Sequence, residues 1–269
     1  MYLKTRGLVL RETEYGDADK LLTVLTPEHG KMTLRARGVR RRSSPLKSPC
    51  QLLAYGEFTL FEYKNRATIN EAEALELFPE LRNDLELLSL ASYFAQVAEA
   101  VSQEDSPNPE ILSLVLNSLY AIGKLQKPRD LVKAAFELRI ACLAGYTPDL
   151  TGCIQCGREE PERFDLSAGC LECAGHRSPE SGGLRMPVTP GVLAAMRYVV
   201  YCEPKRLFSF ALPQEALEGL GGITEGFLMT QLERSFYTLD FYKSLTLTVP
   251  GLPDLGAGAG THNGESKHV

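Results

Sequence analysis

Two pairs of cysteines with the same internal spacing constrain this chain of 269 residues more than any other feature. Cys153 and Cys156 form one CxxC pair, Cys170 and Cys173 form a second, and thirteen residues separate the pairs. Each pair places two thiolates on one tight turn, and two such turns can close a tetrahedron around Zn²⁺. Four thiolates leave no open coordination position. The spacing therefore predicts one structural zinc ion that stabilises the fold and activates no water.

Disulfide bonds or a redox-active dithiol are the alternative interpretations of these cysteines. The total of seven cysteines is odd, and Lys4 and Arg6 interrupt the apolar run that a secretory signal would need. Both features favour reduced thiols over a disulfide framework. His176 could replace one cysteine as a ligand, although a solvated loop histidine is the expected role. Three cysteines lack partner spacing and are expected to be small core residues: Cys50, Cys142 and Cys202.

The net charge of −5 is distributed unevenly along the chain. Residues 1–48 hold eleven basic and five acidic side chains, a net charge of +6, which leaves −11 for residues 49–269. A basic N-terminal part favours a polyanionic partner, and an acidic remainder favours protein contacts. No run approaches the ~20 apolar residues that span a bilayer, so we expect a soluble, cytoplasmic protein without membrane contact.

The first 78 residues alternate polar and apolar side chains in short runs separated by turn residues. Gly56, inside the longest run, predicts a β-bulge or a bend. Five short antiparallel strands with one kink suit a small closed barrel of the OB type. The strands are expected at Tyr2–Arg11, Leu21–Thr26, Lys31–Val39, Gln51–Tyr63 and Arg66–Ala74.

Beyond the barrel, apolar residues recur at helical spacing, which predicts an all-α domain in two parts, 79–150 and 184–245. The zinc-binding insert, 151–183, separates these parts. The last helical region, from about Pro213 to Tyr242, includes Gly219, Gly221 and Gly222, each of which costs about 1 kcal/mol in a helix interior. The tail, 246–269, has too few apolar residues to offset ordering and is expected to be disordered.

A basic run in the predicted barrel is the second candidate site. Arg35 and Arg37 alternate with apolar residues in a strand, and Arg40, Arg41 and Arg42 follow in a Ser/Pro loop where they can bind phosphates. A solvated charged loop and a patch for an acidic protein tail are the alternatives. The DNA-binding residues predicted from this run are Arg35, Arg37, Arg40, Arg41, Arg42 and Lys47. Aromatic side chains that could stack on bases lie nearby at Tyr55, Phe58, Phe61 and Tyr63.

The sequence nominates no catalytic residue. It contains no P-loop, dinucleotide-binding glycine pattern, HExxH or GxSxG motif. Asp17 and Asp19 could bind a metal ion in a nuclease, but in a Gly-Asp-Ala-Asp turn they are expected to stabilise a loop. A zinc-stabilised adaptor that binds only proteins is the other alternative to a DNA-binding protein.

Several segments together resemble the RecO family of bacterial DNA repair proteins. In the N-terminal part they are Gly7–Leu10, Glu14–Asp17, Leu21–Gly30, Ala36–Val39 with the basic Ser/Pro loop that follows, Leu60–Tyr63 and Glu71–Glu73. The resemblance continues through the four-cysteine insert to Leu239–Phe241, and so covers the chain to about residue 245.

This resemblance implies an OB fold, a helical domain and a zinc-binding insert. It also implies a cytoplasmic, nucleoid-associated protein that binds single- and double-stranded DNA and anneals complementary strands. The implied partners are RecR and the C-terminal tail of single-stranded DNA-binding protein, with a functional link to RecA, which loads on gaps. The matching positions are Arg35 to Lys47 for DNA and the four cysteines for zinc. Gly219 to Gly222 depart from the helix that the family would use there.

Overall fold

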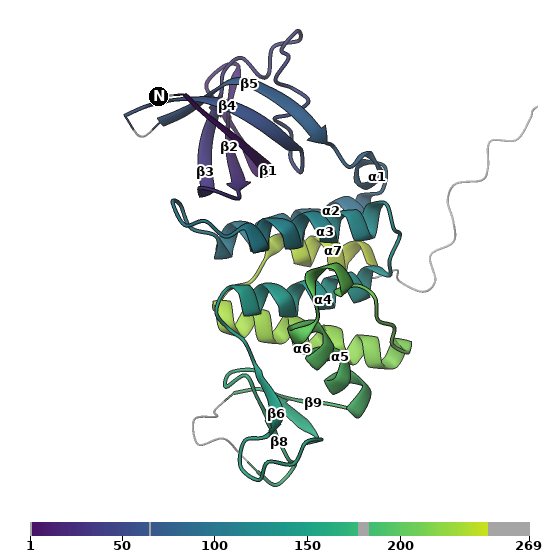
Figure 1. Cartoon of the computed structure of the whole chain (residues 1–269). Helices are drawn as coiled ribbons and strands as arrows, with labels where there is room; N and C mark the ends of the chain where they lie inside the picture. Colours follow the sequence, from purple (N-terminus) through teal and green to yellow (C-terminus); the bar gives the residue numbers. More distant parts are fainter. Residues whose placement is uncertain (1, 65, 177–182, 247–269) are drawn as a thin grey trace, which may run out of the picture.

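Three parts follow one another along the molecule: a barrel, a stack of helices and a small sheet (Figure 1). The computed structural model describes residues 2–64, 66–176 and 183–246. Apart from Thr246, the tail that was predicted to be disordered lies outside these residues. No helix in the described ranges combines the length and the apolar character needed to cross a membrane.

The N-terminal part is a closed barrel with the strand order β1-β2-β3-β5-β4. Neighbouring strands pair antiparallel except β3 and β5, whose parallel pairing joins Leu34 to Ala67 and Arg35 to Thr68. The predicted OB-type barrel is confirmed. Its strands are β1 Tyr2–Tyr15, β2 Asp19–Thr26, β3 Gly30–Ala36, β4 Tyr55–Tyr63 and β5 Arg66–Glu76.

Gly56 lies where strand β4 bends. The register of β4 against β5 shifts between Tyr55 and Gly56, which confirms the predicted irregularity. A Cβ atom added at Gly56 would lie 2.7 Å from the carbonyl oxygen of Glu73, closer than two such atoms approach. Only glycine therefore lets these two strands come together here.

The barrel has its own apolar interior and also shares a core with the helices. Val9, Val24 and Phe58 belong to the interior cluster. Leu8 and Leu10, on the opposite face of β1, belong instead to the core of the helical domain. Because successive side chains of a strand point to opposite faces, β1 buries both faces where the barrel rests on the helices.

The helical part confirms the predicted all-α domain, with one difference near its end. The predicted region from Pro213 to Tyr242 is two helices, because α6 ends at Leu232, the following residue Glu233 is left-handed, and α7 begins at Tyr237. The helices are α1 Pro79–Arg82, α2 Leu85–Val101, α3 Pro109–Gly123, α4 Arg129–Leu143, α5 Pro190–Tyr201, α6 Gln214–Leu232 and α7 Tyr237–Thr246, with a 3₁₀ helix η1 at Pro204–Arg206.

Glycines allow α6 to pass close to the cysteine-rich insert. A Cβ atom at Gly226 would lie 2.8 Å from Cδ1 of Leu166, and one at Gly222 would lie 3.1 Å from Cε of Met186. The ring of Phe227 also packs edge-on against Phe164 of the insert. The helix-propensity cost of these glycines is thus offset by close packing.

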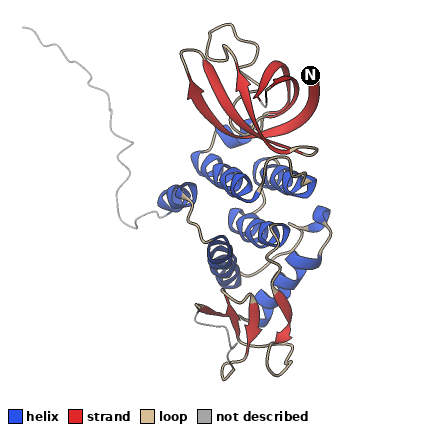
Figure 2. Cartoon of the chain, turned by 90° about the vertical axis from the view of Figure 1, so that its left-hand side faces the viewer, coloured by secondary structure: helices blue, strands red, loops and turns tan. Residues whose placement is uncertain are grey.

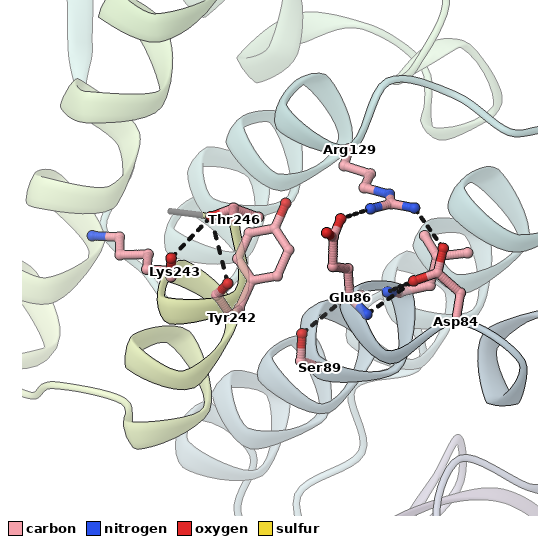
Figure 3. A network of polar contacts seen from close by, with 8 residues as sticks. Asp84, Glu86, Ser89, Arg129, Tyr242, Lys243 and Thr246 are labelled. Atoms are coloured by element: carbon pink, nitrogen blue, oxygen red, sulfur yellow. Dashed lines mark hydrogen bonds and ion pairs between the residues drawn. The ribbon is translucent and has the colours of Figure 1, made fainter. Parts of the chain in front are cut away.

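Polar side chains tie the ends of the helices together (Figure 3). The carboxylate of Asp84 accepts hydrogen bonds from the backbone N–H groups of Glu86 and Leu87 and so caps α2. Arg129, at the start of α4, forms ion pairs with Asp84, at 2.6 Å, and with Glu86. Backbone N–H groups and Arg129 together lower the pKa of Asp84.

The cysteine-rich insert forms a four-stranded sheet of order β6-β8-β7-β9 (Figure 2). Its strands are β6 Asp149–Cys153, β7 Arg163–Asp165, β8 Cys170–Glu172 and β9 Arg185–Pro187, so the sheet begins and ends slightly outside the predicted range of 151–183.

Candidate metal centre and nucleic-acid interface

Four potential metal ligands meet at one end of the small sheet. Within the described part of the chain, Cys153, Cys156, Cys173 and His176 place one ligand atom each within 4.8 Å of one another. Two tight turns present them. The N–H of Gly157 donates to the carbonyl of Cys153 at 2.8 Å, and the N–H of His176 donates to the carbonyl of Cys173 at 3.0 Å.

The spacing of these atoms fits a tetrahedral zinc ion. Zinc–sulfur bonds of about 2.3 Å at tetrahedral angles place two sulfur ligands about 3.8 Å apart, and a sulfur and a nitrogen about 3.6 Å apart. The Sγ atoms of Cys156 and Cys173 lie 3.7 Å apart, and Sγ of Cys153 lies 3.4 Å from Nδ1 of His176. Three sulfurs and one imidazole nitrogen are a donor set that zinc accepts in structural sites.

This group shares three members with the four cysteines predicted from the sequence. Cys170 is outside it, at the start of β8, where it is 5% exposed. His176 takes the fourth place, in contrast to the expected solvated loop histidine. The pair Cys173 and His176 repeats the two-residue gap of Cys153 and Cys156, which is the sequence pattern that could have identified it.

The thiols of the insert differ in their acidity. Burial opposes ionisation of Cys153, but backbone N–H groups, chiefly of Cys156, and the His176 ring lower its pKa to about 5. Burial, followed by the carboxylates of Glu172 and Asp165, raises the pKa of Cys170 to about 11. Cys170 is therefore surrounded by groups that disfavour a thiolate.

The predicted DNA-binding arginines divide into two groups by their contacts. Arg35 donates from Nε and Nη2 to Oδ2 of Asp19, and Arg40 forms an ion pair of 3.1 Å with Glu14. Arg37, Arg41 and Arg42 are exposed and form no ion pair with any residue that the structure describes. Lys47 is also exposed, and its Nζ donates to the backbone carbonyl of Arg42 at 3.2 Å.

Arg35 and Arg37 line a hollow on the outside of the barrel, which we call the barrel groove. Its volume is about 440 Å³. The guanidinium of Arg35 lies over the ring of Tyr15, 5.1 Å from its centroid. The other charged and aromatic residues of the groove are Phe61, Tyr63 and Arg66. Arginines and accessible rings thus share one surface, although the loop residues Arg40 to Lys47 do not line it.

The four aromatic residues considered from the sequence have different positions. Phe61 and Tyr63 are 43% and 63% exposed in the groove, whereas Phe58 is buried inside the barrel and Tyr55 packs against the helical core. The sequence did not identify Tyr15 and Arg66 as groove residues, because their positions depend on how β1 and β5 pair with their neighbours.

The carboxylate of Asp19 stabilises the loop after β3 and does not face an open metal site. Its Oδ1 accepts the N–H of Gly38 at 2.7 Å and its Oδ2 accepts Arg35. The N–H of Gly38 and the arginine together lower the pKa of Asp19. The Asp17 backbone carbonyl accepts a long hydrogen bond of 3.5 Å from Arg40. The side-chain contacts of Asp19 agree with its expected loop role, and Asp17 contributes a backbone contact.

A small apolar pocket lies between α3, α4 and η1 and contains one cationic group. Its volume is about 200 Å³, and its apolar lining comes from Pro109, Leu114, Leu143, Pro204 and Leu207. Arg139 enters the same pocket. Its Nη2 donates to the carbonyl of Cys202 at 2.7 Å, while its buried Nε has no hydrogen-bond partner in the described structure.

Comparison with known proteins gives matches along most of the chain. The family model described as "Recombination protein O N terminal" matches residues 1–78, and that described as "Recombination protein O C terminal" matches residues 82–240. A DNA repair protein RecO of Acetivibrio thermocellus is 34% identical over 250 residues, which cover 91% of this chain and 97% of the relative. The protein of the same name from Alkaliphilus metalliredigens is 29% identical over 248 residues, 91% of this chain and 100% of the relative. The DNA repair protein RecO of Bacillus subtilis is 29% identical over 216 residues, which cover 80% of this chain and 84% of the relative.

Proposed function

The chain belongs to the RecO family of DNA repair proteins, and from this premise we propose that it binds single- and double-stranded DNA through its barrel and anneals complementary strands. Together with RecR and the tail of single-stranded DNA-binding protein, it helps RecA load onto coated DNA at the nucleoid. This is the role of a mediator, and we assign no catalytic residue to it. The barrel groove is the observation that carries the proposal.

The groove combines the two interactions that hold a single strand without reading its sequence. Arg37 and Arg66 are exposed cations that form no ion pair with a described residue, so they are available for phosphates. Phe61 and Tyr63 offer ring faces to bases, and stacking tolerates any base. Arg35, held by Asp19, fixes the position of the Tyr15 ring.

The loop after the groove adds positive charge without aromatic rings. Arg41 and Arg42 are exposed there, and their guanidinium groups have no carboxylate partner within the described ranges. Such a loop suits phosphates of either a single strand or a duplex. Neutralised strands repel one another less, and two strands held near one protein meet at a higher effective concentration, so annealing requires no catalytic group.

We propose that Cys153, Cys156, Cys173 and His176 hold one structural Zn²⁺. The fit of their separations to a tetrahedron supports this ligand set over the four cysteines. All four positions around the ion are then filled by the protein. Zinc stabilises the small sheet and takes no part in DNA chemistry.

We further propose that the pocket containing Arg139 receives the tail of single-stranded DNA-binding protein. A C-terminal tail ends in a carboxylate, and the unpaired Nε of Arg139 is a buried donor for such a group. The apolar lining, which includes Leu114 and Leu207, would take the side chain next to that carboxylate.

The contribution of the loop is tested by measuring the affinity for a fluorescent dT oligonucleotide by anisotropy across a salt series. Replacing Arg40, Arg41 and Arg42 by glutamate removes up to three phosphate contacts, which should weaken binding and reduce the slope of log K against log salt by about 2. Reversing Lys205 and Arg206 on η1 is the control for a change in net charge. Unchanged affinity in the triple variant would remove the loop from the site.

The stacking part of the groove is tested separately. Tyr63→Ala should lower the affinity about tenfold with little effect on the salt slope, because it removes a base stack and no charge. Tyr201→Ala, at another exposed tyrosine, is the matched control. A wild-type protein that binds no oligonucleotide even in dilute buffer would contradict the proposal and favour the adaptor that binds only proteins.

A further inference from the structure

A second hollow with cationic and aromatic residues lies between the barrel and the helical domain, and we call it the interdomain cleft. Its volume is about 620 Å³. Strand β1 contributes Arg11, β3 contributes Lys31, α2 contributes Glu99, and the start of α7 with the residues before it contributes Tyr237 and Arg234. The cleft is therefore built by segments distant in the sequence, and the residues that line it lie outside the predicted DNA-binding run.

Two cations of the cleft are not neutralised by carboxylates. The carboxylate of Glu99 is taken by Arg11, whose Nη2 lies 2.9 Å from it, while Lys31 Nζ donates only to the Glu99 backbone carbonyl, at 3.0 Å. Arg234 lies over the ring of Phe236 and forms no ion pair with a described residue. The remaining acid of the cleft, Glu12, forms an ion pair with Lys20. Lys31 and Arg234 thus leave the cleft with a positive excess.

Tyr237 adds an aromatic surface to this charge. It is 72% exposed at the first position of α7. Its neighbour Thr238 is fixed by a hydrogen bond of 2.5 Å from its hydroxyl to Oε1 of Gln96 on α2. The backbone that carries Tyr237 is therefore fixed to α2, and the Tyr237 ring can stack on a base with little loss of conformational freedom.

A hollow with more carboxylates than amines separates the cleft from the barrel groove, since Glu62, Glu104 and Asp105 line it together with Lys31 and Lys64. The hollow between them shares Lys31 with the cleft, and Thr33, Tyr63 and Ala67 with the groove. Its wall includes the carboxylates of Glu104 and Asp105, which are exposed and form no ion pair with a described residue. One strand that ran through all three hollows would bring its phosphates against these charges. The two cationic hollows are therefore better suited to two strands than to one.

We propose that the interdomain cleft binds a second polynucleotide strand while the barrel groove holds the first. The inference rests on the proposed DNA-binding function and deepens it, because it gives annealing a structural basis within one protein molecule. Lys31 and Arg234 contact phosphates of the second strand, and Tyr237 stacks on one of its bases.

The test uses the full chain and two dT oligonucleotides, one carrying a donor and one an acceptor fluorophore. Because these strands cannot pair, energy transfer between them reports joint occupancy and not annealing. The double variant Arg234→Glu, Tyr237→Ala should keep its affinity for a single oligonucleotide within about twofold while energy transfer falls about tenfold, since the loss of one stack alone weakens binding by about this factor. The annealing rate of complementary strands should fall in parallel. Lys205→Glu with Tyr201→Ala is the matched control.

Arg234→Gln is a milder change at one exposed position and tests the proposal if the double variant misfolds. It should also reduce energy transfer. Energy transfer at the wild-type level in both variants overturns the proposal. It is also overturned if mass photometry finds two oligonucleotides bound only in complexes that contain two protein molecules. Failure of the wild-type protein to bind even one oligonucleotide refutes the proposed function itself. The cleft would be a protein-binding site instead if an acidic peptide bound the wild type but not the double variant, and if this peptide displaced no oligonucleotide.

Discussion

Replacing His176 by alanine should cost the protein its tightly bound zinc, whereas replacing Cys170 should not. Nδ1 of His176 lies 3.4 Å from Sγ of Cys153, close to the edge of a zinc tetrahedron. Cys170 lies outside the ligand group, in an environment that raises its thiol pKa to about 11. The two substitutions therefore separate the ligand set of the structure from the set predicted by the cysteine spacing.

The expected magnitude follows from the number of ligands. Structural zinc sites in small domains bind with about 10–16 kcal/mol, so each of four ligands contributes about 2.5–4 kcal/mol. Loss of His176 should thus weaken zinc binding by about two to three powers of ten. Cys170→Ala removes one buried sulfur atom and should destabilise the fold by about 1 kcal/mol without changing the metal affinity.

Both variants are purified without chelators, and bound zinc is quantified by mass spectrometry and by competition with a chromophoric chelator. Substitution of Co²⁺ into the wild type gives an independent readout, since its visible spectrum distinguishes three sulfur ligands from four. One equivalent of tightly bound zinc in His176→Ala, together with its loss in Cys170→Ala, would refute the geometric argument and return the assignment to the four cysteines. A wild type without any metal would refute the zinc site altogether.

Three further predictions concern stability. Glu137 is fully buried, and its carboxylate pairs with Lys133 at 2.8 Å and accepts hydrogen bonds from the hydroxyls of Tyr93 and Thr224. Glu137→Ala should lower the free energy of unfolding in urea by about 3–5 kcal/mol, because Lys133 keeps only Glu225 as a partner and two buried hydroxyls lose their acceptor. Gly56→Ala should destabilise the barrel by about 1–3 kcal/mol by thermal unfolding, while Gly191→Ala, where a Cβ atom meets open space, should not. The pKa of Asp84 is lowered in the folded protein, so its ionised form stabilises the fold above the ordinary carboxyl range and this contribution is lost as the pH falls through the folded pKa. The stability difference between wild type and Asp84→Asn should therefore shrink as the pH falls below about 4, and a constant difference would contradict a contribution from the ionised carboxylate, since asparagine caps a helix as well as aspartate does.

The barrel was predictable because its determinants are local. Alternation along β1 and β4, the turn residues between strands and the bend at Gly56 are all visible in short windows of sequence. The boundary between α6 and α7 was not, because no glycine or proline marks the break after Leu232. The glycines of α6 argued against a helix, yet α6 packs closely on the insert at Gly222 and Gly226. Intrinsic propensity gives way where a neighbouring element fills the space that the missing side chain leaves.

The sites were predicted less completely, since they depend on which residues the fold brings together. The cysteine spacing identified three members of the candidate ligand group, but it favoured Cys170 because two CxxC pairs already supply four thiolates. His176 takes its place through the turn at Cys173. Likewise the basic run led to Arg35 and Arg37, whereas Arg66 joins them only because β3 and β5 pair in the closed barrel.

The positions of the two sites also determine which parts of the fold should change when the metal is lost. The small sheet and the barrel lie at opposite ends of the molecule (Figure 1). The sheet packs on α6 through Phe164 and Phe227, and its loop carbonyls at Leu166 and Ser167 accept hydrogen bonds from Gln231. The barrel rests on α2 through its own apolar face and the Arg11–Glu99 ion pair. Local unfolding around an empty zinc site would therefore loosen α6 first, and the barrel groove should keep its affinity for a single oligonucleotide in the His176→Ala protein.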